Sequence, residues 1–203
     1  MARTPKVVED RREQIIDAAM RVFAQKGFNK ATNKDIAREA GITAGLIYHY
    51  FESKEAVLKA IIEARSPLRV INSLPAEVIA QPPAIFFRFL ILQVLNIVEG
   101  EQFVQLMRVF LPEAVYNPQM SQVLSGAIQR AIGFLGAYLK AKIEAGELRN
   151  ADPELIPQVL VGSVMAFVLR RRIICDPQAL RYTHEQIADV VVDTVLKGLL
   201  PRS

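Results

Sequence analysis

The chain of 203 residues contains one cysteine and two histidines, and this scarcity limits the chemistry open to it. The single thiol of Cys175 excludes a framework of disulfides within the chain and is typical of a reducing cytoplasm. Because a lone cysteine often behaves as a small hydrophobe, we expect Cys175 to be buried and inert rather than a redox sensor. His49 and His184 lie far apart in the sequence, and no cysteine spacing suits zinc, so no metal site is predicted.

Motifs of catalysis are also missing. The sequence has neither a Walker phosphate loop nor a dinucleotide-binding glycine fingerprint, and its carboxylates are scattered. Glu99 and Glu101 flank a glycine and are interpreted as a solvated junction between two helices. Since an enzyme needs a placed base, nucleophile or metal, we predict that the protein is not an enzyme and uses no cofactor.

No hydrophobic run is long enough to span a bilayer. The longest, residues 159–169, is followed by Arg170, Arg171 and Arg172. The first residues, MARTPKVVEDRRE, lack the apolar core of a signal peptide. These features predict a soluble, cytoplasmic protein that is not exported and has no membrane partner.

The sequence is rich in apolar residues, with a small basic excess near its start. It is 51% hydrophobic and 23% charged, enough for a large core in one or two domains. Of the net charge of +4, residues 1–65 supply +3, with 12 Lys/Arg against 9 Asp/Glu, as phosphate binding would favour. Arg3 and Lys6 lie in an N-terminal arm that either touches DNA or is a solvated end.

Residues 32–51, TNKDIAREAGITAGLIYHYF, predict two short helices joined by a tight turn. Thr32 and Asp35 form a capping-box pattern at the start of the first helix. Gly41 permits the positive φ that ends this helix, and Thr43 can cap the second. Helix, glycine-containing turn and helix make a helix-turn-helix.

The second helix of this pair has two different faces. Ile47 and Phe51 are four residues apart and can pack with Ile42 against the rest of the domain. Ala44 and Gly45 are small, where a helix must approach a groove floor closely, whereas Tyr48 and His49 are long donors. The alternative is an ordinary bundle hairpin in which Tyr48 belongs to the core.

Helices are predicted on both sides of the helix-turn-helix. The one before it covers residues 11–26 and ends at Gly27, which takes the C′ position. The one after it is capped by Ser53 and carries Lys54 in its first turn. Free N–H groups and a lysine can hold a phosphate there, and a solvated lysine is the alternative.

Residues 11–64 resemble the DNA-binding domain of the TetR (tetracycline-repressor) family of bacterial transcription regulators. The resemblance rests on the helix ending AxxVFAQKGF, on the helix-turn-helix above, and on ESKEAVL after it. The chain departs from the family pattern in having Ile47 where Leu is usual and Tyr50 where His is frequent, with its own His49 one residue earlier. The resemblance implies a sequence-specific DNA-binding regulator, most commonly a homodimeric repressor of a palindromic operator.

Nine residues are predicted to contact double-stranded DNA, in two groups. The group nearer the phosphates is Thr32, Lys34, Thr43, Tyr48, Tyr50 and Lys54. The group that faces or approaches the bases is Ala44, Gly45 and His49. Whether His49 or Tyr50 is the one that contacts phosphate stays open.

From residue 66 onward, prolines and glycines divide the chain into longer apolar helices. They cover residues 84–99, then 101–111 with a stop near Pro112, then Pro118 to Gly146, then a stretch from Asp152-Pro153 to about residue 174, and a last helix capped by Thr183 and Gln186. No segment shows convincing strand alternation. We predict an all-α fold of about nine helices: an N-terminal arm and three-helix DNA-binding domain over 1–52, and a helical ligand-binding and dimerisation domain over 53–203.

The last two helices are candidates for contact with a second copy of the chain. Gly162 and Ala166 are four residues apart and permit close approach. Four residues give the final helix a broad apolar face: Val190, Val191, Val195 and Leu199. The resemblance implies a homodimer through a four-helix interface of these helices, and the alternative is that both faces close the monomer core.

Aromatic residues between 84 and 145 are numerous enough to line an apolar cavity with a few polar groups. The candidate ligand-binding residues are Phe86, Phe89, Phe103, Arg108, Phe134 and Tyr138. The resemblance implies a small, often hydrophobic effector that changes the spacing of the two reading heads. The alternative is that these aromatics form core.

Overall fold

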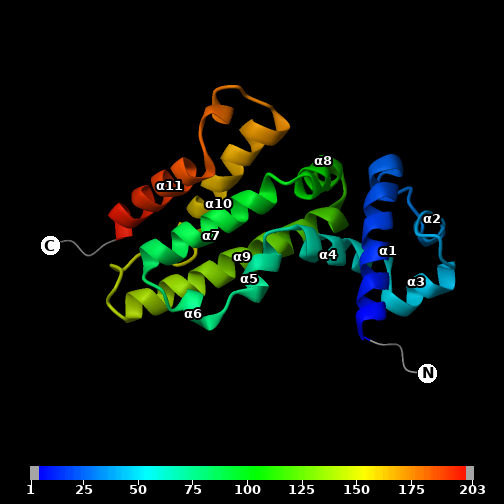
Figure 1. Cartoon of the computed structure of the whole chain (residues 1–203), viewed down its shortest axis with the longest axis horizontal. Coiled ribbons are helices and arrows are strands. Elements are labelled where there is room, and N and C mark those ends of the chain that lie inside the picture. Colours follow the sequence, from blue (N-terminus) through cyan, green and yellow to red (C-terminus); the bar gives the residue numbers. More distant parts are fainter. Residues whose placement is uncertain (1–4, 200–203) are drawn as a thin grey trace. The chain divides into compact units, whose positions relative to one another are not determined.

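The computed structural model describes residues 5–199, and their side chains over residues 10–198 (Figure 1). All regular structure in this part of the chain is helical, so the predicted all-α class is confirmed. Arg3 of the predicted arm lies outside the described residues, as do the side chains of Lys6 and Leu199.

The described residues form eleven α-helices with a π-helix and a 3-10 helix, where the sequence predicts about nine helices. In chain order they are α1 (Pro5–Lys26), α2 (Asn33–Glu39), α3 (Ala44–Tyr50), α4 (Lys54–Arg65), α5 (Leu68–Ser73), α6 (Ala76–Ile79), α7 (Pro83–Val98), α8 (Glu101–Tyr116), α9 (Pro118–Glu144), α10 (Leu155–Val168), the π-helix η1 (Leu169–Ile173), the 3-10 helix η2 (Ala179–Arg181) and α11 (His184–Leu199). The two additional helices are α5 and α6. Pro67 and Pro75 stand just before them, where a missing N–H breaks no helical hydrogen bond.

The predicted stop near Pro112 is wrong, because α8 continues through this proline to Tyr116. Pro112 removes one i→i−4 hydrogen bond but leaves the next turn intact, and the amide of Asn117 donates to the carbonyl of Glu113 at 2.9 Å. The Asn117 side chain then opens α9, since its Oδ1 accepts from the amides of Gln119 and Met120 at 3.0 and 3.3 Å.

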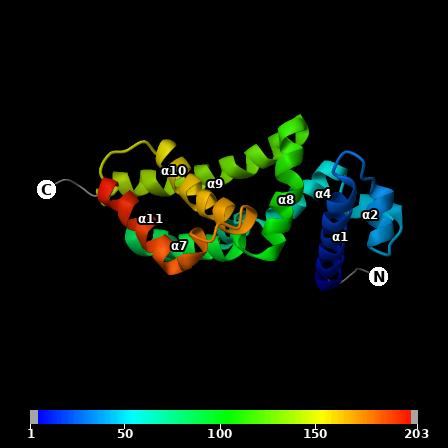
Figure 2. The same ribbon diagram turned by 90° about the horizontal axis from the view of Figure 1, so that it is seen from above.

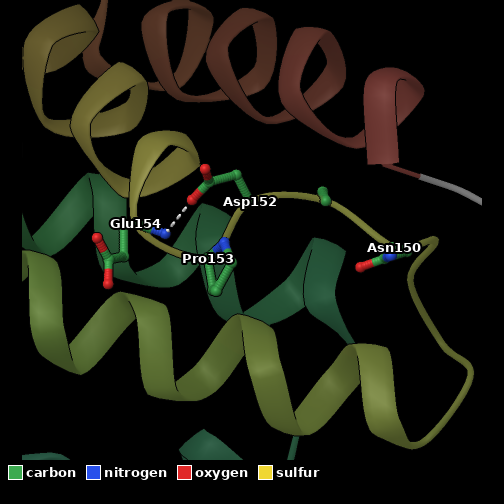
Figure 3. Close-up of a pocket in the computed structure, with 5 residues that line it drawn as sticks. Asn150, Asp152, Pro153 and Glu154 are labelled. Carbon is green, nitrogen blue, oxygen red and sulfur yellow. Dashed lines mark hydrogen bonds between the residues drawn. The ribbon is translucent and has the colours of Figure 1, made fainter.

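The predicted start of α10 at Asp152-Pro153 is wrong, because the helix begins at Leu155 and Glu154 occupies its N-cap position. Asp152 still accepts hydrogen bonds from the amides at this helix start. Asp152 Oδ1 accepts from the amides of Glu154 and Leu155 at 2.8 and 3.0 Å, and Figure 3 shows the first of these bonds. A crevice in this loop is lined by residues 150–154, and Asn150, Asp152 and Glu154 are exposed.

The chain forms two compact units. The first combines the chain up to Ser66 with Gln105–Ser125, and the second combines Pro67–Val104 with the chain from Gly126 onward. α8 and α9 therefore contribute residues to both units. The functional division between residues 52 and 53 stays a prediction, and α4 packs on α1 within the first unit.

In the first unit, α1 supplies the centre of the core, and α2 and α4 pack against it (Figure 1). Its buried residues include Ile15, Ala19, Val22 and Phe23, which recur at helical spacing. Polar groups also join α4 to α1, because the nearly buried Arg65 guanidinium contacts Glu13 at 2.5 Å and Asp17 at 2.8 Å.

In the second unit, α11 packs along α7, and α10 lies against both (Figures 1 and 2). The predicted capping box of α11 is confirmed by reciprocal bonds of 2.9 and 3.3 Å between Thr183 and Gln186. The apolar face predicted for α11 is divided: Val191 is buried and Val195 is half-buried, whereas Val190 is exposed.

Glu99 is not the solvated residue that the sequence predicts. Its carboxylate is 11% exposed and receives two hydrogen bonds from the Arg171 guanidinium, while His184 Nε2 lies 3.2 Å away. Burial alone would raise the pKa of Glu99, but the bonds from Arg171 and His184 outweigh it and lower that pKa. His184 also contacts Asn96 Oδ1 through Nδ1 at 2.9 Å, so these groups join α7, η1 and α11.

Cys175 is exposed, which corrects the expectation of a buried thiol. It adopts a left-handed conformation with φ of 57° just after the π-helix. There the amide of Asp176 donates to the carbonyl of Arg170 at 2.7 Å.

No single helix among the described residues is long and apolar enough to cross a membrane. α7 and α8 pass this test only when taken together, and the chain bends by 70° between them.

Candidate nucleic-acid interface

The helix-turn-helix begins with the predicted capping box. The Asp35 amide donates to Thr32 Oγ1 at 3.2 Å, and the Thr32 amide donates to Asp35 Oδ2 at 3.1 Å. Two backbone donors at the start of α2 are thus satisfied, which fixes where the helix starts.

Asp35 is also the electrostatic centre of this helix start. Its carboxylate is 2.6 Å from Lys26 Nζ and 3.7 Å from the Arg38 guanidinium. The hydrogen bond from Lys26, followed by those from Thr32, lowers the pKa of Asp35 from 3.8 to about 2. The carboxylate therefore stays charged at any physiological pH.

The turn between α2 and α3 forms as predicted, with one difference. Gly41 has a φ of 64°, and the Ile42 amide donates to the carbonyl of Ala37 at 2.9 Å. Thr43 is the N-cap residue of α3, but its hydroxyl makes no capping bond. The exposed Thr43 side chain is consequently not used by the helix it precedes.

α3 is anchored on one face and open on the other. Ile47 and Phe51 are buried, and the Arg12 guanidinium lies 5.3 Å from the centre of the Phe51 ring. Tyr48 is 61% exposed, so its alternative placement in the core is wrong. His49 is exposed as well.

Within the same helix, Tyr50 is half-buried, and the His49 and Tyr50 rings meet edge to face with centroids 5.3 Å apart. Ala44 is half-buried at the start of the helix. His49 and Tyr50 are the two candidates for the phosphate contact. Tyr50 is less accessible to solvent than His49.

Gly45 lies in the first turn of α3 and is exposed. Its φ is not positive, and a Cβ placed there would meet no atom of the rest of the protein within 4 Å. The fold therefore does not require glycine at this position.

Lys34 and Thr32 are exposed, as phosphate contacts should be, but Lys54 is placed differently. The Lys54 ammonium donates to the carbonyls of Phe28, Ala31 and Asn29 at 2.7, 3.1 and 3.4 Å. Since an ammonium has three N–H donors, these acceptors can use all of them. Nothing in the sequence indicates these bonds, because Phe28 lies 26 positions before Lys54.

Two family models together match most of the chain. Residues 15–61 match the model described as bacterial regulatory proteins of the tetR family. Residues 87–198 match the AefR-like transcriptional repressor C-terminal domain.

The chain belongs to the TetR family. A relative that matches both of these regions is the HTH-type transcriptional regulator SrpR of Pseudomonas putida, which is 30% identical in a match that covers 83% of this chain and 90% of SrpR. The regulator HbdR of Aromatoleum sp. (strain CIB) is 50% identical over 54 residues, 27% of this chain, and this match spans only 24% of HbdR.

Solved structures of similar fold include two ligand complexes. The regulator FadR of Bacillus subtilis with stearoyl-CoA has a TM-score of 0.71 at 23% identity, covering 92% of this chain and 98% of FadR. The complex of SmeT with triclosan has a TM-score of 0.72 at 22% identity, covering 95% of this chain and 92% of SmeT. At these identities the likeness concerns the fold.

This TetR-family protein is thus a DNA-binding transcriptional regulator, and family membership confirms the prediction that it is not an enzyme. Among the described residues, no group of His, Cys, Asp and Glu side chains is arranged to hold a metal ion.

The predicted ligand-binding residues of this TetR-family regulator are only partly brought together. Phe86 stacks on Tyr138 with ring centroids 3.9 Å apart and lies 6.4 Å from Phe134. Phe89 is on the same helix as Phe86 but is 37% exposed. Phe103 is buried on α8 within the second unit. Arg108 belongs to the first unit and is exposed.

Tyr138 carries the polar group of this aromatic cluster. Its hydroxyl donates to the carbonyl of Gln81 at 3.2 Å. Burial, with the charge of Glu147, raises the pKa of Tyr138 well above its ordinary value. The phenol is therefore neutral and acts as a hydrogen-bond donor.

The Asp35 capping box makes stability depend on acid pH. Because the folded-state pKa of Asp35 is depressed, its stabilising effect is fully present above its ordinary pKa of 3.8 and is lost as pH falls towards about 2. We expect Asp35→Asn to lower the free energy of unfolding at pH 5, and the difference from the wild type to shrink between pH 4 and pH 2. Denaturant unfolding of both proteins between pH 5 and pH 2 measures this difference in the free energy of unfolding. A difference that is independent of pH would contradict the assignment.

Proposed function

We propose that the protein binds a palindromic operator as a homodimer, represses transcription from it, and is released by a small hydrophobic effector. DNA recognition is assigned to the exposed face of α3. Ala44, Gly45 and His49 face or approach the bases. Thr32, Lys34, Thr43, Tyr48 and Tyr50 lie towards the phosphates.

The observation that carries this assignment is Gly45. Glycine in a helix costs up to about 1 kcal/mol relative to alanine, and neither packing nor backbone conformation demands it here. Its exposed neighbours Tyr48 and His49 can both donate hydrogen bonds. A glycine kept on a donor-rich helix surface fits close approach of that surface to a groove.

The dimer is proposed to form through α10. Leu155, Val159 and Leu169 are 58%, 55% and 43% exposed, and the exposed Gly162 and Ala166 stand between them. These positions follow one another at spacings of four, three, four and three residues, the repeat by which one helix packs along another. The exposed Val190 on α11 extends the apolar surface of the last two helices. Two recognition helices are also needed to contact enough base edges.

The effector is proposed to bind at the aromatic cluster of the second unit. Phe86 and Tyr138 supply buried apolar surface, the half-buried Phe134 borders it, and the Tyr138 hydroxyl supplies one polar group. The complexes of FadR with stearoyl-CoA and SmeT with triclosan support a hydrophobic ligand in this fold. Binding would favour a dimer whose recognition helices no longer match successive major grooves.

DNA recognition is tested by selecting bound sequences from random double-stranded DNA. We expect a palindrome whose affinity falls steeply with salt. Gly45→Ala should preserve or raise thermal stability, yet weaken binding to the selected DNA by about tenfold, because its methyl group intrudes on the close approach.

Gly133→Ala is the matched control. Gly133 is exposed within α9, and a Cβ there also meets no atom within 4 Å. The same added methyl should therefore leave DNA affinity unchanged. If Gly45→Ala binds the selected DNA as tightly as the wild type, the proposed docking of α3 is wrong.

The dimer interface predicts an effect of one added charge. Val159→Lys should convert a species of twice the 22.7 kDa subunit mass into one of a single subunit mass, because the charge would be buried between apolar helices. Gln158→Lys adds the same charge at the adjacent exposed residue, which is not one of the five residues proposed to face the partner helix, and this variant should remain dimeric. Gel filtration with light scattering at micromolar concentration distinguishes them, and a wild type of single subunit mass would remove the dimer from the proposal.

The effector proposal predicts opposite effects on the protein and on its DNA complex. With stearoyl-CoA and triclosan as probes, a compound that raises the melting temperature should weaken operator binding in fluorescence anisotropy. By linkage, bound DNA should weaken the binding of that compound by the same factor. A compound that stabilises the protein and tightens DNA binding would contradict the release mechanism.

A further inference from the structure

The α1–α2 loop (residues 27–31) leads directly into the helix-turn-helix. It begins at Gly27, which has a φ of 74°, and ends one residue before Thr32, the N-cap of α2. Its internal backbone bonding includes one bond of 3.3 Å from the Ala31 amide to the Gly27 carbonyl. The position of this loop sets where α2 starts, and side chains from two other elements hold it.

On one side the loop is held from α4. Lys54 Nζ donates to the carbonyls of Phe28, Asn29 and Ala31, as described above, and lies 4.4 Å from the centre of the Phe28 ring. Three carbonyl oxygens and one ring face thus surround a single cation. The charge stabilises an irregular backbone that has few bonds of its own.

On the other side the loop is held from the α8–α9 corner, formed by Phe110, Glu113 and Asn117. Glu113 Oε1 accepts from the Phe28 amide at 3.1 Å. Asn117 is buried, and its Nδ2 donates to Asn29 Oδ1 at 2.9 Å. Phe110 of the same corner packs edge to face on Phe23, with the ring centroids 5.9 Å apart.

The contact between Glu113 and the loop is close enough to restrict the sequence. A Cβ at Gly27 would lie 2.6 Å from Glu113 Oε1, so glycine is needed there for this approach as well as for its positive φ. The carboxylate therefore sits directly on the turn that ends α1.

α8 has a weak point beside this contact. Pro112 immediately precedes Glu113 and deprives the helix of one i→i−4 hydrogen bond. α8 begins in the second unit and ends in the first. Glu113 lies in the last part of α8, which follows Pro112.

We propose that the α8–α9 corner is a positioning element of the DNA-binding head. Glu113 and Asn117 hold the α1–α2 loop against Lys54, and loss of the Glu113 contact releases the loop and lowers DNA affinity. Lys54 acts here through the loop rather than as a phosphate contact. This inference rests on the proposed DNA-binding function and names the residues that position the DNA-binding head.

The first test compares two substitutions of Glu113 with a control. Glu113→Ala removes the acceptor and should weaken binding to the selected DNA about tenfold, whereas Glu113→Gln keeps an oxygen acceptor and should stay within about threefold of the wild type. Glu144→Gln removes the same charge from an exposed site near the end of α9 and should not weaken binding.

The change in net charge caused by Glu113→Ala would by itself strengthen DNA binding, whereas the proposal predicts weaker binding. Removing a carboxylate from a DNA-binding protein reduces repulsion from phosphates, so charge alone would strengthen binding. If Glu113→Ala binds as tightly as the wild type, or if Glu113→Gln is as weak as Glu113→Ala, the proposal is overturned.

Amide hydrogen exchange tests the loop without DNA. The Phe28 amide should exchange about tenfold faster in Glu113→Ala than in the wild type, with the Ile61 amide in the core of α4 unchanged as an internal control. An unchanged Phe28 rate overturns the proposal. Because this measurement needs no operator, it separates failure of the positioning role from failure of DNA binding itself.

The last experiment substitutes Lys54. Lys54→Met should weaken DNA binding without changing the slope of affinity against salt, and the double variant with Glu113→Ala should lose less than the product of the two single losses. A slope reduced by about one would make Lys54 a phosphate contact and overturn its assigned role.

Discussion

The proposed recognition helix α3 has seven residues and is too short to be stable alone, so it depends on packing within the first unit. α3 keeps its shape because Ile47 and Phe51 are buried against the other helices, a contribution of about 2 kcal/mol from each side chain. This burial uses one face of α3 only. The opposite face, with Gly45, Tyr48 and His49, takes no part in holding the helix and is exposed to solvent.

The features that the sequence predicts correctly depend on residues close together in the chain. The capping boxes of α2 and α11 join residues three apart, and the positive φ of Gly27 and Gly41 follows from the need to end a helix. The helices on either side of the helix-turn-helix follow from apolar residues at helical spacing and from their end signals at Gly27 and Ser53. The family resemblance then supplied the function, because the same local motifs recur in regulators of this family.

The features that were missed depend on partners distant in the sequence. Lys54 bonds to Phe28 across 26 positions, Glu113 reaches the same residue across 85, and Arg171 reaches Glu99 across 72. A sequence shows that a charge exists but not which group will meet it, so the sequence alone predicts surface positions for both Lys54 and Glu99. Cys175 was misplaced for a related reason, since whether a turn is covered depends on which helices pack beside it.

These distant polar contacts share a physical purpose that apolar packing does not serve. A charged group removed from water adds little net stability, because desolvation offsets much of the attraction to its partners, but leaving it without them is costly. Arg65 with Glu13 and Asp17, and Lys54 with its three carbonyls, therefore select one arrangement of the head more than they strengthen it. Since none of these groups belongs to the exposed face of α3, the residues of that face can change without disturbing the contacts that hold the helix in place.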